Sequence, residues 1–81
     1  MIIYYLTAHA QERLIQRSLR IEEIEKALTE PDYSYPGKQG ELNFVKKLSK
    51  GKTIRVVAMP DKEKIKIITA VIMRSTEGRV K

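Results

Sequence analysis

The sequence predicts a single α+β domain, in which a helical pair packs on a twisted, mainly antiparallel sheet. Its 81 residues lie below the size of two ordinary domains, so one core is expected. Apolar residues recur with helical spacing over residues 8–30, whereas β-branched residues are concentrated after residue 41. The absence of cysteine excludes a disulfide scaffold. We therefore expect one domain over residues 1–75 and a flexible tail over residues 76–81.

The first two predicted elements are a short strand and a helix. Residues 2–6 are β-branched and aromatic, which favours a strand. Thr7 then offers a side-chain oxygen that can cap a helix over residues 8–17. The side of that helix expected to face the core carries Ala8, Ala10, Leu14 and Ile15.

A second helix and three strands complete the predicted fold. An apolar stripe (Ile21, Ile24, Ala27 and Leu28) runs along residues 21–30, and Pro31 ends the helix. A three-residue link makes the two helices a hairpin. Residues 31–40 have turn formers at both ends, which predicts a loop. Strands are expected at residues 42–48, 53–59 and 64–73, so the order is β-α-α-β-β-β with both helices on one sheet face.

The net charge of +6 is unevenly distributed along the chain. Residues 1–37 carry four Lys/Arg and six Asp/Glu, whereas residues 38–66 carry nine and three. A basic sheet indicates an anionic partner, although lysines can also merely keep a domain soluble and protect strand edges. The start of the sequence lacks the pattern of a secretory leader, and the longest apolar stretch, residues 67–73, is too short to span a bilayer. These features predict a cytoplasmic protein with no membrane partner.

The best candidates for chemistry are His9, Arg13 and Arg17, because a spacing of four residues places them in one stripe along a helix. Metal-independent RNA cleavage needs a group that exchanges protons and cations that stabilise charge on phosphorus. Histidine exchanges protons near neutral pH, and arginine matches the geometry of phosphate oxygens. The alternative interpretation is a solvated helix surface. With a single histidine and no cysteine, we expect no metal site of nitrogen or thiolate ligands, and no cofactor.

Further candidates lie in the predicted strands. Lys46 and Lys47 are adjacent, so a strand would point them to opposite faces. We expect Lys47 to face the open side, and Lys46 to share the helical side with Leu42 and Phe44, from which its long side chain could still reach the rim. Arg55 interrupts an apolar strand, which is unusual unless it faces solvent or a ligand, and Thr69 interrupts the last strand. The alternative for Thr69 is that threonine is an ordinary strand residue.

Two tyrosines in the predicted loop are candidates for contacts with unpaired bases. Tyr33 and Tyr35 lie near Lys38 and can stack on bases, or they can pin the loop to the domain. The sequence contains no glycine-rich phosphate loop, no paired catalytic carboxylates and no Ser/His/Asp set. The common enzyme classes that use those motifs are therefore excluded.

Most of the chain, about residues 6–71, resembles a family of small prokaryotic domains of unknown function, and the resemblance is most specific in the first third. The family reads roughly H-A-x3-R-x3-R-G-I-S-x-E-E-V-x-x-A-L-x-x-P, and this chain carries Thr-Ala-His-Ala at 7–10, Arg13, Arg17, Glu-Glu-Ile at 22–24, Ala-Leu at 27–28 and Pro31. Residues 68–71, Ile-Thr-Ala-Val, resemble the family's last strand. Ser18 stands where the pattern has a helix-ending glycine, and Arg20 where it has a capping serine.

That family has been grouped with RelE-like and BrnT-like ribonuclease toxins. The resemblance implies a RelE-like fold and an active cleft lined by His9, Arg13, Arg17, a sheet lysine and Thr69. It therefore favours a metal-independent endoribonuclease that acts by 2′-hydroxyl attack, with RNA, free or on the ribosome, as substrate and an acidic antitoxin as partner.

Two alternatives stay open. The same basic surface suits a non-catalytic RNA-binding or ribosome-associated module. A protein-interaction domain that binds an acidic partner, or dimerises through the edge strand 2–6, is the third hypothesis. The sequence is compatible with a monomer or a homodimer.

Overall fold

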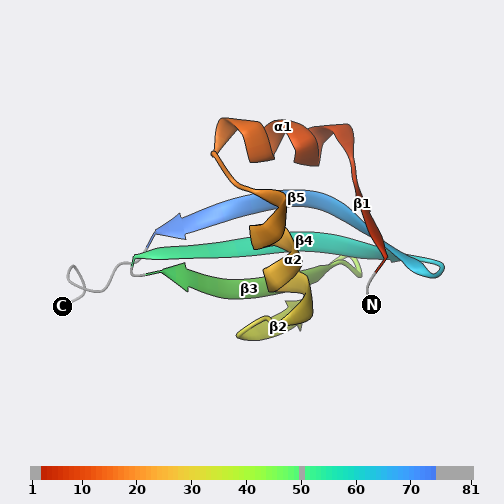
Figure 1. Ribbon diagram of the computed structural model, residues 1–81. Helices are drawn as coiled ribbons and strands as arrows, with labels where there is room; N and C mark the ends of the chain where they lie inside the picture. Colours follow the sequence, from red (N-terminus) through yellow and green to blue (C-terminus); the bar gives the residue numbers. More distant parts are fainter. Residues whose placement is uncertain (1–2, 50, 75–81) are drawn as a thin grey trace.

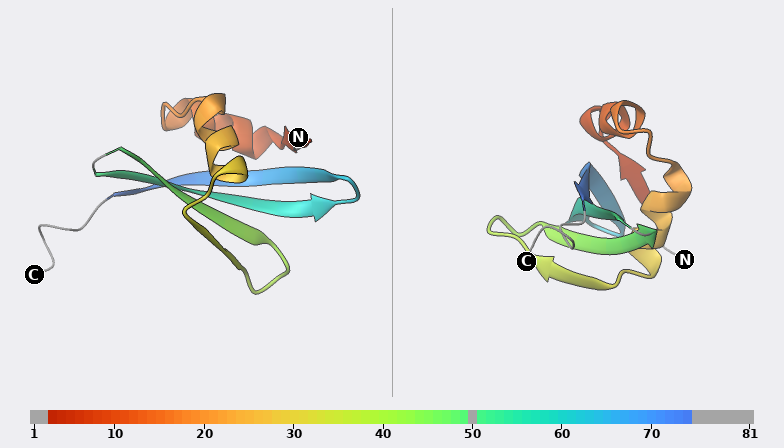
Figure 2. Two further views of the ribbon diagram at one scale, coloured as in Figure 1. Left: turned by 60° about the horizontal axis from the view of Figure 1, so that its bottom comes forward. Right: turned by 90° about the vertical axis from the view of Figure 1, so that its left-hand side faces the viewer.

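A computed structural model describes residues 3–49 and 51–74, which form two helices and a five-stranded sheet (Figure 1). The elements in chain order are β1 (Tyr4–Leu6), α1 (Ala8–Gln16), α2 (Ile21–Thr29), β2 (Tyr33–Pro36), β3 (Leu42–Ser49), β4 (Lys52–Asp61) and β5 (Lys64–Arg74). Both helices lie on the same side of the sheet (Figure 2), with α1 against β5 and α2 against β3 and β4. The tail predicted for residues 76–81, and Ser75, lie outside the described residues.

The sheet has the strand order β1-β5-β4-β3-β2. The last four strands in the sequence form an antiparallel meander, whereas β1 runs parallel to β5, with Tyr4 opposite Ile65 and Leu6 opposite Ile67. The sheet is therefore mixed, and it twists strongly (Figure 2). The predicted α+β class and the mainly antiparallel sheet are confirmed.

The predicted element order is wrong at one strand, because residues expected to form a loop include β2. Tyr33 pairs with Val45 and Pro36 pairs with Leu42, so the four residues extend the sheet beyond β3. Proline cannot donate to a strand ladder, but β2 is an edge strand and Pro36 is its last residue. Turn formers on both sides concealed this short strand, although two tyrosines favour one.

The core lies between the helices and one face of the sheet. On β4, alternate side chains are completely buried: Ile54, Val56 and Ala58. Ile67 and Ala70 of β5 join them from the sheet, and Ile24, Ala27 and Leu28 cover them from α2. Because strand side chains alternate between faces, the intervening residues of β4 point to the opposite, open face.

The prediction for the buried side of α1 is partly wrong. Ala10 is buried and Leu14 packs against the core, but Ala8 is exposed and Ile15 is 80% exposed. A helix turns by about 100° per residue, so Ile15 points well away from the direction that Ala10 and Leu14 share. Ile21, at the start of α2, is also exposed, at 37%.

Thr7 fixes the start of α1, as the sequence predicts. Its Oγ1 accepts a hydrogen bond from the Ala10 N–H at 3.1 Å. The same hydroxyl donates to the carbonyl of Ile68, and the Thr7 N–H donates to the carbonyl of Ile67. Ile68 is the extra residue of a β-bulge, since Val57 pairs with Thr69 and Ala58 with Ile67. The first turn of α1 is therefore anchored to β5 at the bulge.

α1 ends in a Schellman motif built on a serine. Ser18 has a φ of 54°, in the left-handed region. The Leu19 N–H donates to the Leu14 carbonyl at 2.9 Å, and the Ser18 N–H donates to the Ile15 carbonyl at 3.2 Å. Leu19 then enters the core. This geometry requires a backbone conformation that glycine adopts without steric cost and serine does not.

Replacing Ser18 by glycine should stabilise the protein. We expect Ser18→Gly to raise the free energy of unfolding by about 0.5–1 kcal/mol, because relief of the left-handed strain exceeds the added entropy of the unfolded chain. Thermal or urea unfolding would measure the change. Ser18→Ala is the control and should give no increase, because alanine keeps the strain; an equal gain from both variants would contradict this explanation.

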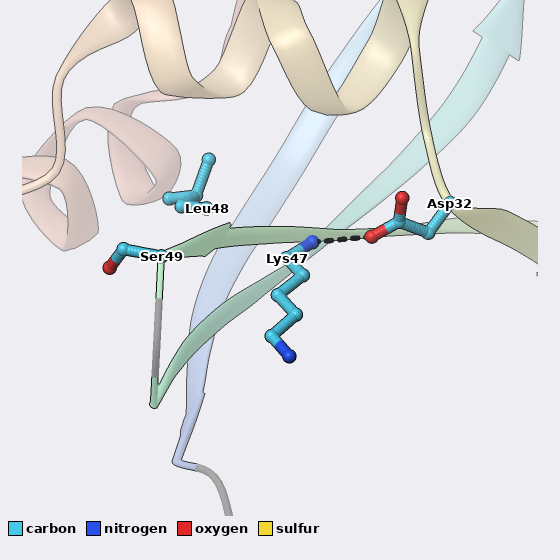
Figure 3. A pocket seen from close by; sticks show the side chains of 4 residues that line it. All are labelled: Asp32, Lys47, Leu48 and Ser49. Carbon is cyan, nitrogen blue, oxygen red and sulfur yellow. Dashed lines mark hydrogen bonds between the residues drawn. The ribbon is translucent and has the colours of Figure 1, made fainter.

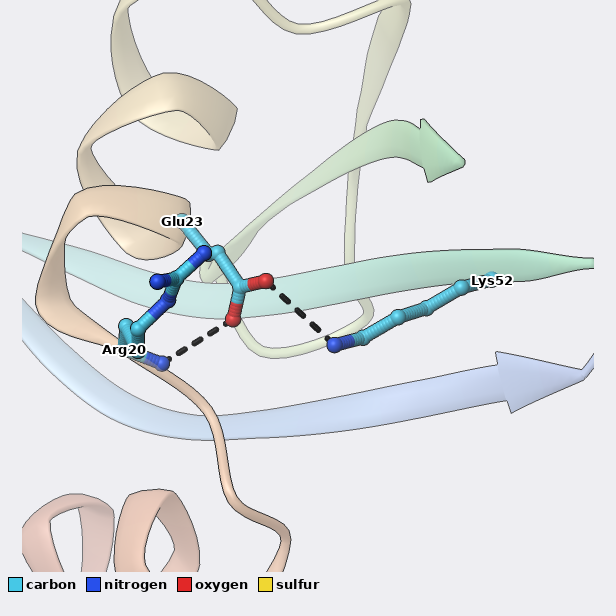
Figure 4. A network of polar contacts seen from close by, with 3 residues as sticks. All are labelled: Arg20, Glu23 and Lys52. Carbon is cyan, nitrogen blue, oxygen red and sulfur yellow. Dashed lines mark hydrogen bonds and ion pairs between the residues drawn. The ribbon is translucent and has the colours of Figure 1, made fainter. Parts of the chain in front are cut away.

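A half-buried carboxylate joins the start of α2 to the sheet (Figure 4). Glu23 accepts a hydrogen bond from the Arg20 backbone N–H at 2.9 Å and forms an ion pair with Lys52 of β4 at 3.3 Å. The arginine side chain has no acceptor for a helix N–H. Glu23 therefore supplies one half of a capping box, and a serine at position 20 would supply the other half. Burial alone would raise the pKa of Glu23, but the Arg20 and Lys52 contacts together outweigh it and lower the pKa.

The lowered pKa predicts how stability depends on pH. A carboxylate with a depressed folded-state pKa stabilises the protein fully above its unfolded pKa, and this contribution is lost as the pH falls through the folded pKa. We expect Glu23→Gln to lower the free energy of unfolding by about 1 kcal/mol at pH 7, and the difference from wild type to shrink below about pH 4.5. Urea unfolding at several pH values would measure it.

Glu22→Gln is the matched control, because Glu22 lies in the same helical turn but is exposed. It should produce a smaller change at pH 7. A Glu23→Gln deficit of constant size between pH 3 and pH 7 would contradict the assignment of the effect to the Glu23 charge.

Candidate functional site

The predicted site residues fall into two groups in the structure. One group, His9, Arg13 and Arg17, lies along α1 and at its carboxyl end. The other group lies on the open face of the sheet and comprises Tyr33, Tyr35, Lys47, Arg55 and Thr69. Lys38 lies in the turn between β2 and β3, and Lys46 points to the helical side.

In the first group, His9 and Arg13 are in direct contact. Arg13 Nε donates a hydrogen bond to His9 Nε2 at 3.2 Å, and Arg13 Nη1 donates to Gln16 Oε1 at 3.0 Å. In this contact Arg13 is the donor and the imidazole nitrogen of His9 is the acceptor. The His9 side chain is exposed, whereas Arg13 is half-buried. An imidazole nitrogen and a guanidinium therefore share one surface of α1.

Arg17 lies closer to the core than the other two members of its group. It follows Ala10 by two helical turns and is half-buried, and its Nη1 is buried without a hydrogen-bond partner among the described residues. A guanidinium nitrogen in that position lacks the acceptor that such groups normally have. Arg17 is therefore a cation held near the contact between α1 and the sheet.

The second group is defined by the strand register. Tyr33 lies opposite Val45, Val45 opposite Arg55, and Arg55 opposite Val71. One step along the same face, a second row reads Tyr35, Asn43, Val57 and Thr69. Residues directly opposite each other share a face, and the row between these two contains the buried Val56 and Ala70. Both rows therefore lie on the face that carries no helix in the described part of the chain.

The two tyrosines form an exposed aromatic pair. Their ring centroids are 6.2 Å apart with an interplanar angle of 23°, and Tyr33 and Tyr35 are 56% and 39% exposed. Arg55 Nη1 reaches across β3 to donate a hydrogen bond to the Tyr35 hydroxyl at 3.4 Å. Beneath them, Val45 and Asn43 are buried. The arrangement presents two aromatic rings and a guanidinium to solvent on one patch.

Lys47 and Thr69 lie on this open face but not together. Lys47 shares a row with Thr53 and Met73, so it lies four residues along β5 and two strands away from Thr69. At ordinary strand dimensions, their Cα atoms are about 16 Å apart. Thr69 instead follows Ile68, which anchors the first turn of α1. One phosphate cannot contact both side chains.

The two lysines of β3 occupy opposite faces, as the alternation predicts. The Lys47 side chain points away from the helices, whereas that of Leu48 points toward them (Figure 3). Lys46 lies opposite the buried Ile54 and forms an ion pair with Asp32 at 3.8 Å. Lys46 therefore lies on the helical side, as its strand position predicts.

Asp32 shapes a hollow of about 470 Å³ at the end of β3, lined by Asp32, Lys47, Leu48 and Ser49 (Figure 3). Its carboxylate accepts the Lys47 backbone N–H at 2.7 Å in addition to the Lys46 ion pair. A carboxylate at its wall makes this hollow unfavourable for a phosphate.

Two residues of the open face were missed from the sequence. Asn43 shares the row of Tyr35, and its Nδ2 lies 3.5 Å from the Tyr35 carbonyl oxygen. Lys66 lies opposite Tyr5 and Met59 on the same face. Strand alternation could have placed both residues on the open face. Asn43 is four residues before Lys47 and so shares its face, and Lys66 lies between Ile65 and Ile67, which face the core. At this end of the face the Tyr5 hydroxyl donates to Asp61 at 2.6 Å, and this bond, followed by burial, raises the pKa of Tyr5.

Over residues 3–49 and 51–74, no three His, Cys, Asp or Glu side chains lie close enough together to hold a metal ion. Neither helix in the same ranges has the length and apolar character needed to cross a membrane.

Comparison with known proteins gives a family and no characterised relative. No curated protein and no solved structure matches the chain significantly. Residues 6–72 match a family described as a domain of unknown function, DUF4258. This range runs from the last residue of β1 to two residues before the end of β5. It includes α1 with its basic stripe and the two rows of the open face that begin at Tyr33 and Tyr35. The chain is therefore a member of the DUF4258 family of domains of unknown function.

Proposed function

We propose that this protein is a cytoplasmic, metal-independent endoribonuclease of the RelE-like class. The hydrogen bond between His9 Nε2 and Arg13 carries the proposal. It places an imidazole nitrogen directly beside a guanidinium on the surface of α1. These are the two groups that RNA cleavage needs at one phosphate, a base and a charge-stabilising cation.

The proposed reaction begins when a phosphate replaces His9 as the acceptor for Arg13. An anionic oxygen is a stronger acceptor than a neutral ring nitrogen, so the exchange frees the His9 lone pair. His9 then removes the proton of a 2′-hydroxyl, whose oxygen attacks phosphorus. The bond from phosphorus to the 5′-oxygen breaks, the 5′-oxygen takes a proton from water, and a 2′,3′-cyclic phosphate remains. Arg17 supplies a second positive charge one turn farther along.

The charge of the sheet supports RNA as the partner. Lys47, Arg55 and Lys66 lie on the open face, and Lys38 lies in an adjoining turn. A basic surface raises the local concentration of RNA, free or on the ribosome, and an acidic antitoxin that covers it would block access.

The proposal predicts that His9 is needed for cleavage and not for binding. We expect His9→Ala to lower the cleavage rate of single-stranded RNA by about 100-fold or more in the presence of EDTA, the loss typical of a general base. RNA affinity should stay within about twofold of wild type, because the permanently charged lysines and arginines of the surface supply most of the phosphate attraction. Gel-based cleavage assays and fluorescence anisotropy, with and without ribosomes, would measure both quantities.

Ile15→Ala is the matched control on the same helix, since Ile15 is highly exposed and points away from the basic stripe. It should cleave as wild type does. A substrate with 2′-deoxyribose at the cleaved position should bind normally and remain intact. Equal cleavage by wild type and His9→Ala would overturn the assignment of the base.

A non-catalytic RNA-binding module is the second candidate, and one observation favours it. In the described ranges the His9 ring bonds to Arg13 and to no carboxylate, so no second proton donor is positioned at the ring. This candidate predicts tight RNA binding with no cleavage by wild type, with or without ribosomes. Absence of RNA binding at physiological salt would defeat both candidates and favour a protein partner.

A further inference from the structure

The open face carries two exposed aromatic rings that have no role in the proposed cleavage site. Tyr33 and Tyr35 are large, exposed and side by side on an edge strand. Tyrosines in a loop commonly hold it to the domain, but here the segment is held by backbone pairing with β3. The rings are therefore not required to fix the backbone, and Tyr33 is more than half exposed.

We infer that unpaired RNA bases stack on Tyr33 and Tyr35, and that the strand then crosses the open face along the row that ends at Thr69. This inference rests on the proposed RNA substrate, and it defines that substrate as single-stranded. Bases in a duplex are stacked on each other and are not available to protein rings, whereas every unpaired base has a face that stacks on an aromatic side chain.

The charges around the pair fit a nucleic-acid backbone. Arg55 lies next to Tyr35, and its Nε is buried without a hydrogen-bond partner among the described residues. Lys47 lies on the neighbouring strand β3, two residues beyond the Tyr33 partner Val45, so it is diagonal to Tyr33 and within reach for a long side chain. Each ring therefore has one basic group beside it. If a base stacks on each ring, Arg55 and Lys47 are placed to contact the phosphates on the two sides of the stacked bases.

The row of Tyr35 leads from this patch across the open face to the edge of the sheet nearest α1. It crosses from β2 to β5 through Asn43 and Val57 and ends at Thr69, a distance of about 14 Å at ordinary strand spacing. Thr69 adjoins the bulge residue that anchors the first turn of α1, and His9 belongs to that turn. β1 ends opposite Ile67, so Thr69 lies at the edge of the sheet, and a strand that follows this row would pass around that edge to reach α1 on the other side.

The test is a double-mutant cycle between the rings and the bases. The probes are a fluorescent single-stranded RNA, the same RNA with two adjacent abasic positions, its duplex and the equivalent DNA strand. We expect Tyr33→Leu/Tyr35→Leu to weaken binding of the intact RNA by about 5- to 150-fold, the range reported for loss of one stacked base. The same variant should bind the abasic RNA as wild type does, because the partner bases are already missing.

Salt dependence separates stacking from charge. The tyrosine variant should keep the wild-type slope of log affinity against log salt concentration, whereas Lys47→Ala should reduce its magnitude by about 0.7. Tyr33→Phe/Tyr35→Phe retains both rings and should bind nearly as wild type does. Equal loss for intact and abasic RNA would overturn the inference, as would duplex binding as tight as single-strand binding. DNA affinity equal to that of RNA would show stacking without recognition of the 2′-hydroxyl and would overturn the RNA assignment.

The two proposals fail in different ways. Wild-type affinity in the tyrosine variants, together with lost cleavage in His9→Ala, would remove the stacking site and leave the ribonuclease. A clear coupling between rings and bases, with no cleavage by any variant, would keep the stacking site and remove the nuclease.

Discussion

The alternation of side chains along β4 determines which residues of this domain can meet a ligand. Ile54, Val56 and Ala58 are completely buried under the helices, and burial of such side chains supplies much of the free energy of folding. A shift of one residue would expose all three, so the register of β4 is strongly determined. Arg55 and Val57 are consequently directed to the open face, and pairing with β3 and β5 extends this division to the neighbouring strands.

The bulge at Ile68 is the one place where β5 departs from that alternation. Ile67 and Ala70 both face the core although three positions separate them, because Ile68 adds a residue between them. The bulge exposes the Ile68 carbonyl to Thr7, which both caps α1 and donates to this carbonyl. One irregularity in the sheet thus sets the position of the helix that carries His9 and Arg13.

The sequence contains enough local information for the helices and for most strands. The cap at Thr7, the stripe of Ile24, Ala27 and Leu28 and the stop at Pro31 are local signals, and the structure contains both helices at nearly the predicted bounds. Ile15 was misplaced because the apolar side of a short helix is poorly defined by two or three residues. β2 was missed because a four-residue edge strand depends on pairing with β3, a non-local contact.

The candidate site follows the same division between local and non-local information. The contact between His9 and Arg13 follows from helical spacing, and the opposite orientations of Lys46 and Lys47 follow from strand alternation. The grouping of Tyr33, Tyr35, Arg55 and Thr69 on one face requires the register of four strands and the position of the bulge. Neither is encoded within a window of neighbouring residues.

The parallel pairing of β1 with β5 has a consequence for the order of folding. Thr7 and Ile68 are 61 positions apart in the chain, yet they meet at the anchor of α1. Such non-local contacts form late, because the entropy of closing a long loop must be overcome before they contribute. During synthesis, α1 therefore emerges long before the strand that receives it, and it stays undocked until β5 has been made. The antiparallel meander of β2–β5 provides the surface, and the arrival of β1 and α1 completes the domain.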